Sequence, residues 1–213
     1  MAHNMDESTL RDRLRTEWRS LRSLVWRSSD YSLCCHQCSC GRIFPGKSKD
    51  KKRFVELLVR AAPETAGLIS LPLLFNSKLP DEVNLANLEA HLSKFQPSQI
   101  ITTSDVDLPE NQTLNLCPGL PIKQVRSNSY ACLLYEEVRS SYMHEYDAGN
   151  RTNPWAMSIK DNQPASYVNI VNANRRIHFH IEWLALIAKR CASYANELQF
   201  LPQSDPAEWW LGD

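Results

Sequence analysis

The chain has 213 residues, 43% of them hydrophobic and 23% charged, which is typical of a folded protein with a buried core. It contains neither an apolar stretch long enough to cross a bilayer nor a signal peptide, so we expect a cytoplasmic protein without a membrane partner. The net charge is zero, but residues 1–60 hold 13 Lys and Arg against 7 Asp and Glu, which indicates either a nucleic-acid footprint or two solvated faces of opposite sign.

The first predicted element is an amphipathic helix over residues 8–27. Ser8 or Thr9 can cap it, and its other faces are rich in arginine. The apolar side chains that recur at helical spacing are Leu10, Leu14, Trp18, Leu21 and Val25. Together with the cysteine-rich connection that follows, this helix forms a basic N-terminal extension over residues 1–48.

The connection contains the cluster CCHQCSC at 34–40. Cys35 and Cys38 have the spacing of half a zinc site, which nearby or distant groups could complete: His36 and Cys40, or His178 and His180. The alternative is that these cysteines are unliganded apolar side chains. Seven cysteines, an odd number, without an export signal argue against a disulfide framework. We therefore assign no metal and no cofactor.

The segment GRIFPGKS at 41–48 matches the pattern of a phosphate-binding loop, in which Lys47 would contact phosphates and Ser48 would bind magnesium. Such a loop should follow a buried strand of a parallel sheet, and here a polar, cysteine-rich stretch precedes it. We interpret the segment as a basic loop. A nucleotide-dependent protein that uses Lys47 is the alternative.

Residues 49–213 are predicted to form a mainly α domain. A helix runs from about Asp50 to Ala62, where Pro63 ends it, and another covers 82–95, with Leu85, Leu88 and Leu92 on one stripe. Residues 96–125 contain several prolines and no sustained period. They are expected to form a long connection with one short strand at 100–103.

Two further elements are expected near the C-terminus. Alternation over 166–180 predicts a β-hairpin that places His178 and His180 on the same side, where they could bind metal or phosphate or be half-buried and hydrogen-bonded. A last helix covers 182–198. The aromatic tail EWWLGD at 208–213 is a candidate to dock on the folded part.

The helix predicted over 128–146 carries YEEVRSSYMHEY, with Arg139, His144 and Tyr146. On an ideal helix at about 100° per residue, Arg139 lies at the edge of the apolar stripe and His144 lies roughly 140° around from it. One straight α-helix does not present Arg139 and His144 together. Joint chemistry therefore requires a distortion of the helix near His144 or facing groups from a second copy.

Arg-x4-His is the signature of the HEPN superfamily, helical-bundle proteins that include many prokaryotic metal-independent ribonucleases. The longer pattern Arg139-x4-His144-x-Tyr146, preceded by LLYEEV, resembles the HEPN toxins that pair with a minimal nucleotidyltransferase antitoxin. The resemblance covers residues 128–147, with Ser140 where the family often has asparagine. It implies an HEPN-like helical bundle, here with a small β-hairpin near the C-terminus and an N-terminal helical extension.

The resemblance also implies a function: a metal-independent endoribonuclease, toxin or defence effector, whose homodimer forms one composite cleft. His144 would act as general acid or base and Arg139 would hold the scissile phosphate, giving a 2′,3′-cyclic phosphate. Ser140 and Glu137 would orient these groups, and Tyr146 would support the cleft or accept nucleotide from an antitoxin. Non-specific RNA contacts would come from Arg11, Arg15, Arg19 and Arg22.

A different class of function is open as well. A catalytically inactive HEPN-like protein would bind RNA or a partner protein, with Arg139 paired to an acid at the edge of the core. His144 would then be a histidine near a helix C-terminus, where the helix dipole favours its charge.

Overall fold

The structure is a computed structural model that describes residues 50–95, 100–140, 151–152, 163–169, 175–198 and 209. This part of the chain is mainly helical with one small antiparallel sheet, as the sequence predicts. Its helices are α3 (Asp50–Ala61), α4 (Pro63–Ala66), α5 (Leu71–Phe75), α6 (Ala86–Leu92), α7 (Thr103–Val106), α8 (Glu110–Leu116), α9 (Ile122–Ser127), α10 (Tyr130–Leu133), the π-helix η2 (Leu134–Ser140) and α12 (Ile181–Leu198). Its strands are β1 (Ile101–Thr102), β2 (Ala165–Asn169) and β3 (Arg175–Phe179).

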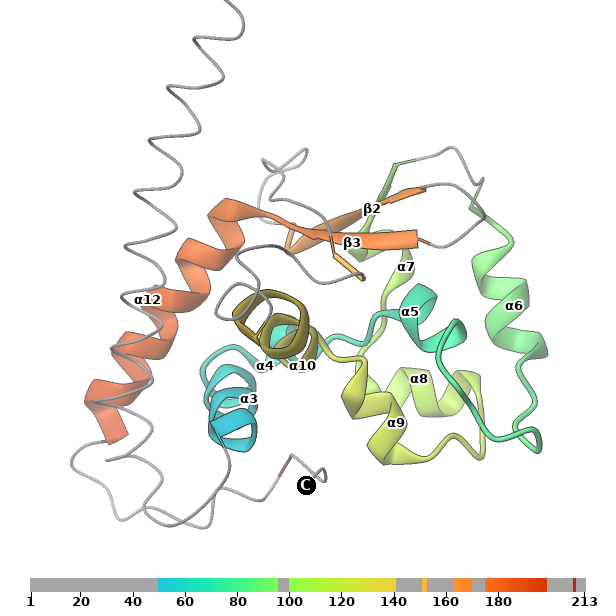
Figure 1. The fold of residues 1–213 in the computed structure, drawn as a ribbon, viewed down its shortest axis with the longest axis horizontal. Coiled ribbons are helices and arrows are strands. Elements are labelled where there is room, and N and C mark those ends of the chain that lie inside the picture. The colour runs from blue at the N-terminus through green and yellow to red at the C-terminus, as the bar shows by residue number, and fades with distance from the viewer. Residues whose placement is uncertain are drawn as a thin grey trace, which may run out of the picture.

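The hairpin of β2 and β3 lies along one side of the helices (Figure 1). In that view α3, α4 and α10 lie below the hairpin, α12 on the left, and α6, α8 and α9 on the right. The helix α12 packs on α3, and α3 also packs on α10. None of the helices in the described ranges is long and apolar enough to cross a membrane.

Two of the helices predicted outside the motif region are confirmed. The helix α3 begins at Asp50 and ends at Ala61, just before Pro63, and α12 covers Ile181–Leu198. The helix predicted over 82–95 is shorter, since α6 covers only Ala86–Leu92 and buries Leu88. The predicted N-terminal helix and the whole extension over 1–48 lie outside the described residues.

The expectation of a long connection over 96–125 is wrong in its described part. The short strand is confirmed as β1, but three short helices, α7, α8 and α9, follow it. Pro109 and Pro121 are the N-cap residues of α8 and α9. Proline suits the start of a helix because its missing N–H has no intrahelical partner there. In this chain the prolines therefore start helices as well as separating them.

The hairpin confirms the alternation seen in the sequence. The register pairs Ala165 with Phe179 and Tyr167 with Ile177, and β1 adds an outer strand by pairing Ile101 with Tyr167. All five of these side chains belong to the buried core. Since alternate residues point to opposite faces, this face of the sheet closes over α10 and α12. Residues 170–174, where the turn is predicted, lie outside the described residues.

A buried carboxylate lies where the sheet meets the helices. Asp107, at the end of α7, accepts hydrogen bonds from the hydroxyls of Tyr130 and Tyr167, the latter at 2.5 Å, and from the Leu71 backbone N–H at 3.0 Å. The Tyr167 hydroxyl also lies 2.8 Å from Oγ of Ser70. Burying a neutral polar group without a hydrogen-bond partner costs roughly 2–7 kcal/mol, and burying an unpaired carboxylate costs more. The donors around Asp107 offset this cost. The contact thus joins α5, α7, α10 and β2.

Burial changes the acidity of this carboxyl. Removal from water raises the pKa of Asp107 from 3.8 to about 7, although the two tyrosine hydroxyls and the Leu71 N–H oppose the shift. Between these two values the folded chain retains a proton that the unfolded chain releases. The free energy of unfolding therefore falls as pH rises from about 4 to about 7, by at most about 1.4 kcal/mol per pH unit from this group.

Replacing Asp107 by Asn should remove this slope. Urea unfolding at several pH values between about 4 and about 7 measures the free energy of unfolding of both proteins, and its decline with pH should be shallower in Asp107→Asn. His180, whose pKa burial lowers, acts in the opposite sense and is present in both proteins, so the difference in slope reports Asp107. Asp81→Asn, at an exposed acid, is the matched control. Equal slopes in Asp107→Asn and wild type would contradict the prediction.

Candidate active site

The structure describes part of the predicted Arg–His motif. Arg139 and Ser140 are the last residues of η2, and only their backbone is described. His144 and Tyr146 lie outside the described residues, as do the four arginines of the extension and Cys35 and Cys38. Of the predicted site, the described side chain is that of Glu137.

The motif helix is not a continuous α-helix. Its first turn is α10, which Ser129 caps by accepting a hydrogen bond from the Cys132 N–H at 3.3 Å. From Leu134 to Ser140 the helix is a π-helix, in which hydrogen bonds join residues five apart instead of four. The α-helical prediction is therefore wrong for this stretch. Within it, Glu137 is buried while Tyr135 and Val138 are only half-buried.

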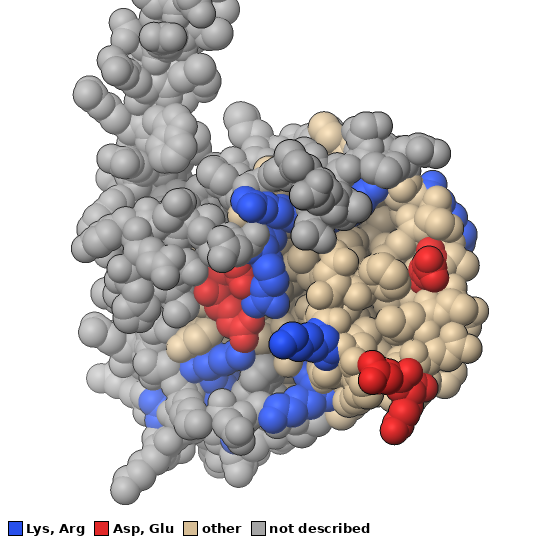
Figure 2. All heavy atoms as spheres, turned by 45° about the vertical axis from the view of Figure 1, so that its right-hand side comes forward, with Lys and Arg blue, Asp and Glu red and all other residues tan. Residues whose placement is uncertain are grey.

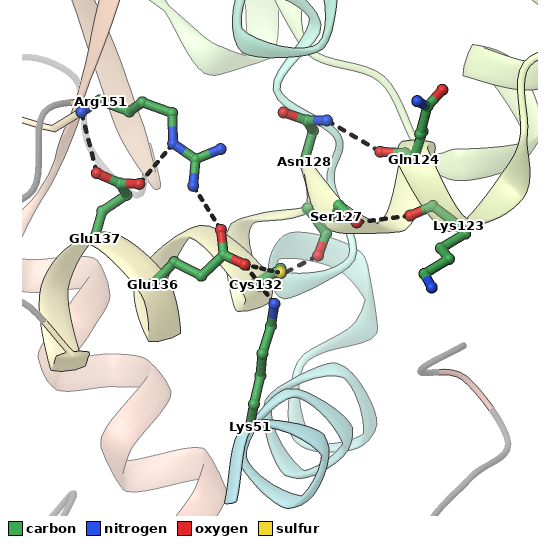
Figure 3. Close-up of polar contacts among 10 residues, drawn as sticks. Lys51, Lys123, Gln124, Ser127, Asn128, Cys132, Glu136, Glu137 and Arg151 are labelled. Atoms are coloured by element: carbon green, nitrogen blue, oxygen red, sulfur yellow. Dashed lines mark hydrogen bonds and ion pairs between the residues drawn. The ribbon is translucent and has the colours of Figure 1, made fainter. Parts of the chain in front are cut away.

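An ion cluster holds η2 against its neighbours. It consists of Lys51 from α3, Glu136 and Glu137 from η2, and Arg151, whose side chain bridges both acids (Figure 3). Arg151 reaches Glu136 and Glu137 at 2.5 Å each, and its backbone N–H donates to Glu137 at 3.1 Å. Lys51 pairs with the other oxygen of Glu136. Two positive and two negative groups thus neutralise one another beside Arg139.

The cluster sets the charge of its own members. Burial raises the pKa of Glu136, but Lys51 and Arg151 outweigh this and the net shift is downward. The neighbouring thiol of Cys132 lies 3.7 Å from Glu136. Burial and then the Glu136 charge raise the pKa of Cys132 to about 12, so it stays a thiol at neutral pH. The cluster therefore contains no thiolate nucleophile, and its carboxylate is held ionised.

Glu137 contacts Arg151 in the structure. Its two carboxylate oxygens accept from Arg151, and its side chain is 11% exposed. The prediction that Glu137 orients His144 or Arg139 is not tested, because those side chains are not described. The observed contacts join η2 to Arg151.

On the surface, acidic side chains lie between basic ones next to a broad uncharged area (Figure 2).

Sequence reasoning missed the positive half of this cluster. Lys51 and Arg151 are 85 and 15 residues from Glu136, so no local spacing indicates the contacts. The only available signal was the pair of adjacent acids in LLYEEV. Two acids next to each other concentrate negative charge, which nearby cations stabilise.

Of the two histidines predicted on the return strand, His180 is a hydrogen-bonded group of a buried face. His180 is fully buried, and its Nδ1 donates to the Gln163 carbonyl at 2.9 Å, which leaves Nε2 to accept from Ser166 Oγ at 3.1 Å. Burial lowers the pKa of His180, so the ring is neutral and does not attract phosphate by charge. His178 is half-buried. The metal or phosphate alternative for this pair thus finds no support at His180.

Metal ligation was also an alternative for the cysteines. Cys117, Cys132 and Cys191 are buried and form no disulfide, and Cys132 and Cys191 lie in α10 and α12. Across the part of the chain that the structure describes, no group of three or more His, Cys, Asp or Glu side chains could hold a metal ion.

No protein-family model, curated protein or solved structure matches the chain.

Breaking the ion cluster should destabilise the protein more than breaking an exposed ion pair does. Arg151→Met leaves the largely buried Glu137 with the backbone N–H of residue 151 but without the guanidinium, and should lower the free energy of unfolding by about 1–2 kcal/mol. In a double-mutant cycle with Glu137→Gln, the coupling energy should be about 1 kcal/mol. Urea unfolding of the four proteins measures it.

The matched control is the ion pair between Arg190 and Glu64, whose side chains are 41% and 54% exposed. Its cycle should give a coupling below about 0.5 kcal/mol, because water screens both charges. A coupling for Arg151 and Glu137 no larger than that of the control would mean that the cluster does not hold η2 in place.

Proposed function

We propose that the chain is a metal-independent endoribonuclease that acts as a homodimer, as a toxin or defence effector, with Arg139 and His144 as catalytic residues. The observation that supports this most is the π-helix η2, which includes Arg139 and Ser140. π-helical turns are rare in proteins, and many of those that occur lie at functional sites. Here the π-helix coincides with the stretch that the HEPN resemblance selects from the sequence.

The π-helix bears on the geometric difficulty of the motif. The separation of roughly 140° between Arg139 and His144 applies to a straight α-helix. That geometry no longer applies at Arg139, because the hydrogen bonds of η2 join residues five apart. Five residues is also the spacing of the arginine and the histidine in the motif. A second copy that faces the motif is the other way to bring the two groups together.

The ion cluster contributes rigidity to the proposed site. Lys51 of α3 and Arg151 both form ion pairs with acids of η2. The ring of Phe54, also in α3, lies 5.6 Å from that of Tyr135. A backbone held in this way loses little freedom when its side chains bind a ligand. Preorganised donors stabilise developing charge most effectively, which is the role that we propose for the Arg139 guanidinium.

The proposed reaction uses the 2′-hydroxyl of RNA as the nucleophile. His144 would remove the proton from this hydroxyl or give one to the leaving 5′-oxygen, because an imidazole can accept or donate a proton near neutral pH. Arg139 would hold the scissile phosphate, and the product would be a 2′,3′-cyclic phosphate. Ser140 and Tyr146 would support the cleft, and an antitoxin that transfers nucleotide to Tyr146 would block it. Glu137 would act at a distance, by holding η2.

The first test is RNA cleavage in EDTA by wild type, His144→Ala and Arg139→Lys. The wild type should leave cyclic phosphate ends, and loss of the acid–base group should slow cleavage by about 10²–10⁴-fold. Arg139→Lys keeps the charge but loses the planar fork, so it should also be impaired. His91→Gln, on α6, replaces a histidine that contacts the Val106 carbonyl and should cleave normally.

Folding and dimerisation of each variant are checked by circular dichroism and light scattering. If a folded wild-type dimer leaves a broad panel of RNAs intact, the ribonuclease proposal fails. The inactive RNA- or partner-binding protein then becomes the better description. RNA binding that His144→Ala leaves unchanged would support that description.

A mixing experiment tests whether the site is composite. If Arg139 of one copy acts with His144 of the other, mixed dimers of Arg139→Ala and His144→Ala contain one intact site. Random exchange in a two-fold dimer should then restore about a quarter of the wild-type activity. If both groups act within one copy, mixing restores nothing.

A further inference from the structure

Trp209 occupies a site made by side chains of separate helices. Its backbone N–H donates to Glu56 Oε1 at 2.7 Å, and its carbonyl accepts from Nη1 of Arg126. The Arg126 guanidinium also lies over the indole, with Cζ 4.9 Å from the ring centroid. One residue is thus held through its donor, its acceptor and its aromatic ring. Trp209 belongs to the aromatic tail that the sequence marked as a candidate to dock.

The groups that bind Trp209 are fixed by partners of their own. Arg126 of α9 forms a fork with Glu110 of α8, at 2.6 and 3.0 Å, which leaves Nη1 directed at the Trp209 carbonyl. Glu56 of α3 is fully buried, and its second oxygen accepts from Arg60 Nε at 3.2 Å. Side chains fixed in this way lose little conformational freedom when they bind a ligand.

The chemistry of the site defines its ligand. A glutamate oxygen that accepts from the N–H of a residue and an arginine that donates to the carbonyl of the same residue recognise the backbone of a peptide segment. These contacts alone would accept any residue other than proline. The guanidinium above the ring adds selectivity, because a cation interacts more favourably with the face of tryptophan than with that of other aromatic side chains.

We infer that Glu56, Glu110 and Arg126 form a recognition site, here called the tail clamp, for a peptide segment that carries tryptophan. Its resident ligand is Trp209 of the chain's own C-terminal segment. The clamp draws on α3, α8 and α9 and on none of the catalytic residues proposed above. Its test is therefore independent of ribonuclease activity.

The covalent tether determines how the clamp behaves. A segment attached to the same chain has an effective concentration of the order of millimolar, so it outcompetes a dilute free peptide. Wild-type protein should therefore bind an added tail peptide only weakly. A full chain that lacks the indole at 209 should accept the peptide.

The experiment uses a fluorescein-labelled peptide of residues 206–213, PAEWWLGD, and follows its anisotropy during titration with full-length protein. Saturable binding is expected with Trp209→Ala and at least tenfold weaker binding with wild type. In the Trp209→Ala background, Glu56→Gln and Arg126→Lys should each weaken binding at least tenfold. Glu89→Gln, at an exposed acid on α6, should leave it unchanged.

Peptide variants test the selectivity of the clamp. Replacing the residue that corresponds to Trp209 by Ala should abolish binding, whereas the same change at Trp210 should leave most of it. Equal binding of the two altered peptides would overturn the inference, and so would a folded Trp209→Ala chain that binds no peptide. A wild-type dimer that dissociates on Trp209→Ala would place the tail in a second copy and overturn the assignment within one chain.

Discussion

The carboxylate of Asp107 fixes how the sheet lies on the helices. Its donors come from α5, α10 and β2, so these elements cannot shift relative to one another without leaving a buried acid unpaired. Tyr130, one of the donors, is also the first residue of α10, and its ring packs edge-on against Phe179 and Trp183. The start of the motif helix is therefore placed by the same contact that places the hairpin.

The helix α3 connects the two regions with proposed roles. Lys51 and Phe54, in its first half, contact η2, and Glu56, half a turn further along, binds the backbone of Trp209. A single rigid helix thus contacts both the candidate active site and the tail clamp. Movements of α3 would alter both sites together, while the sheet and α10 are held separately by Asp107.

The sequence predicted the elements whose apolar pattern is long and regular. It did not predict helices too short to show a period, or a helix whose period differs from that of an α-helix. The helices α3 and α12 and the hairpin were predicted because each shows its apolar period over many residues of the sequence. Helices α7, α8 and α9 are too short to show a period. The π-helix could not be read from a rule that assumes 3.6 residues per turn. Arg151 and Asp107 depend on partners far away in the sequence, which spacing alone does not reveal.

The π-helix also changes what a deletion in the motif helix would do. A π-helical turn takes in one residue more than an α-helical turn, so removing a single residue between Leu134 and Arg139 would allow the stretch to return to α-geometry. The wider turns already take up that residue, so its loss would leave the direction of the residues that follow nearly unchanged. In a regular α-helix the same deletion would rotate every later position by about 100° around the axis.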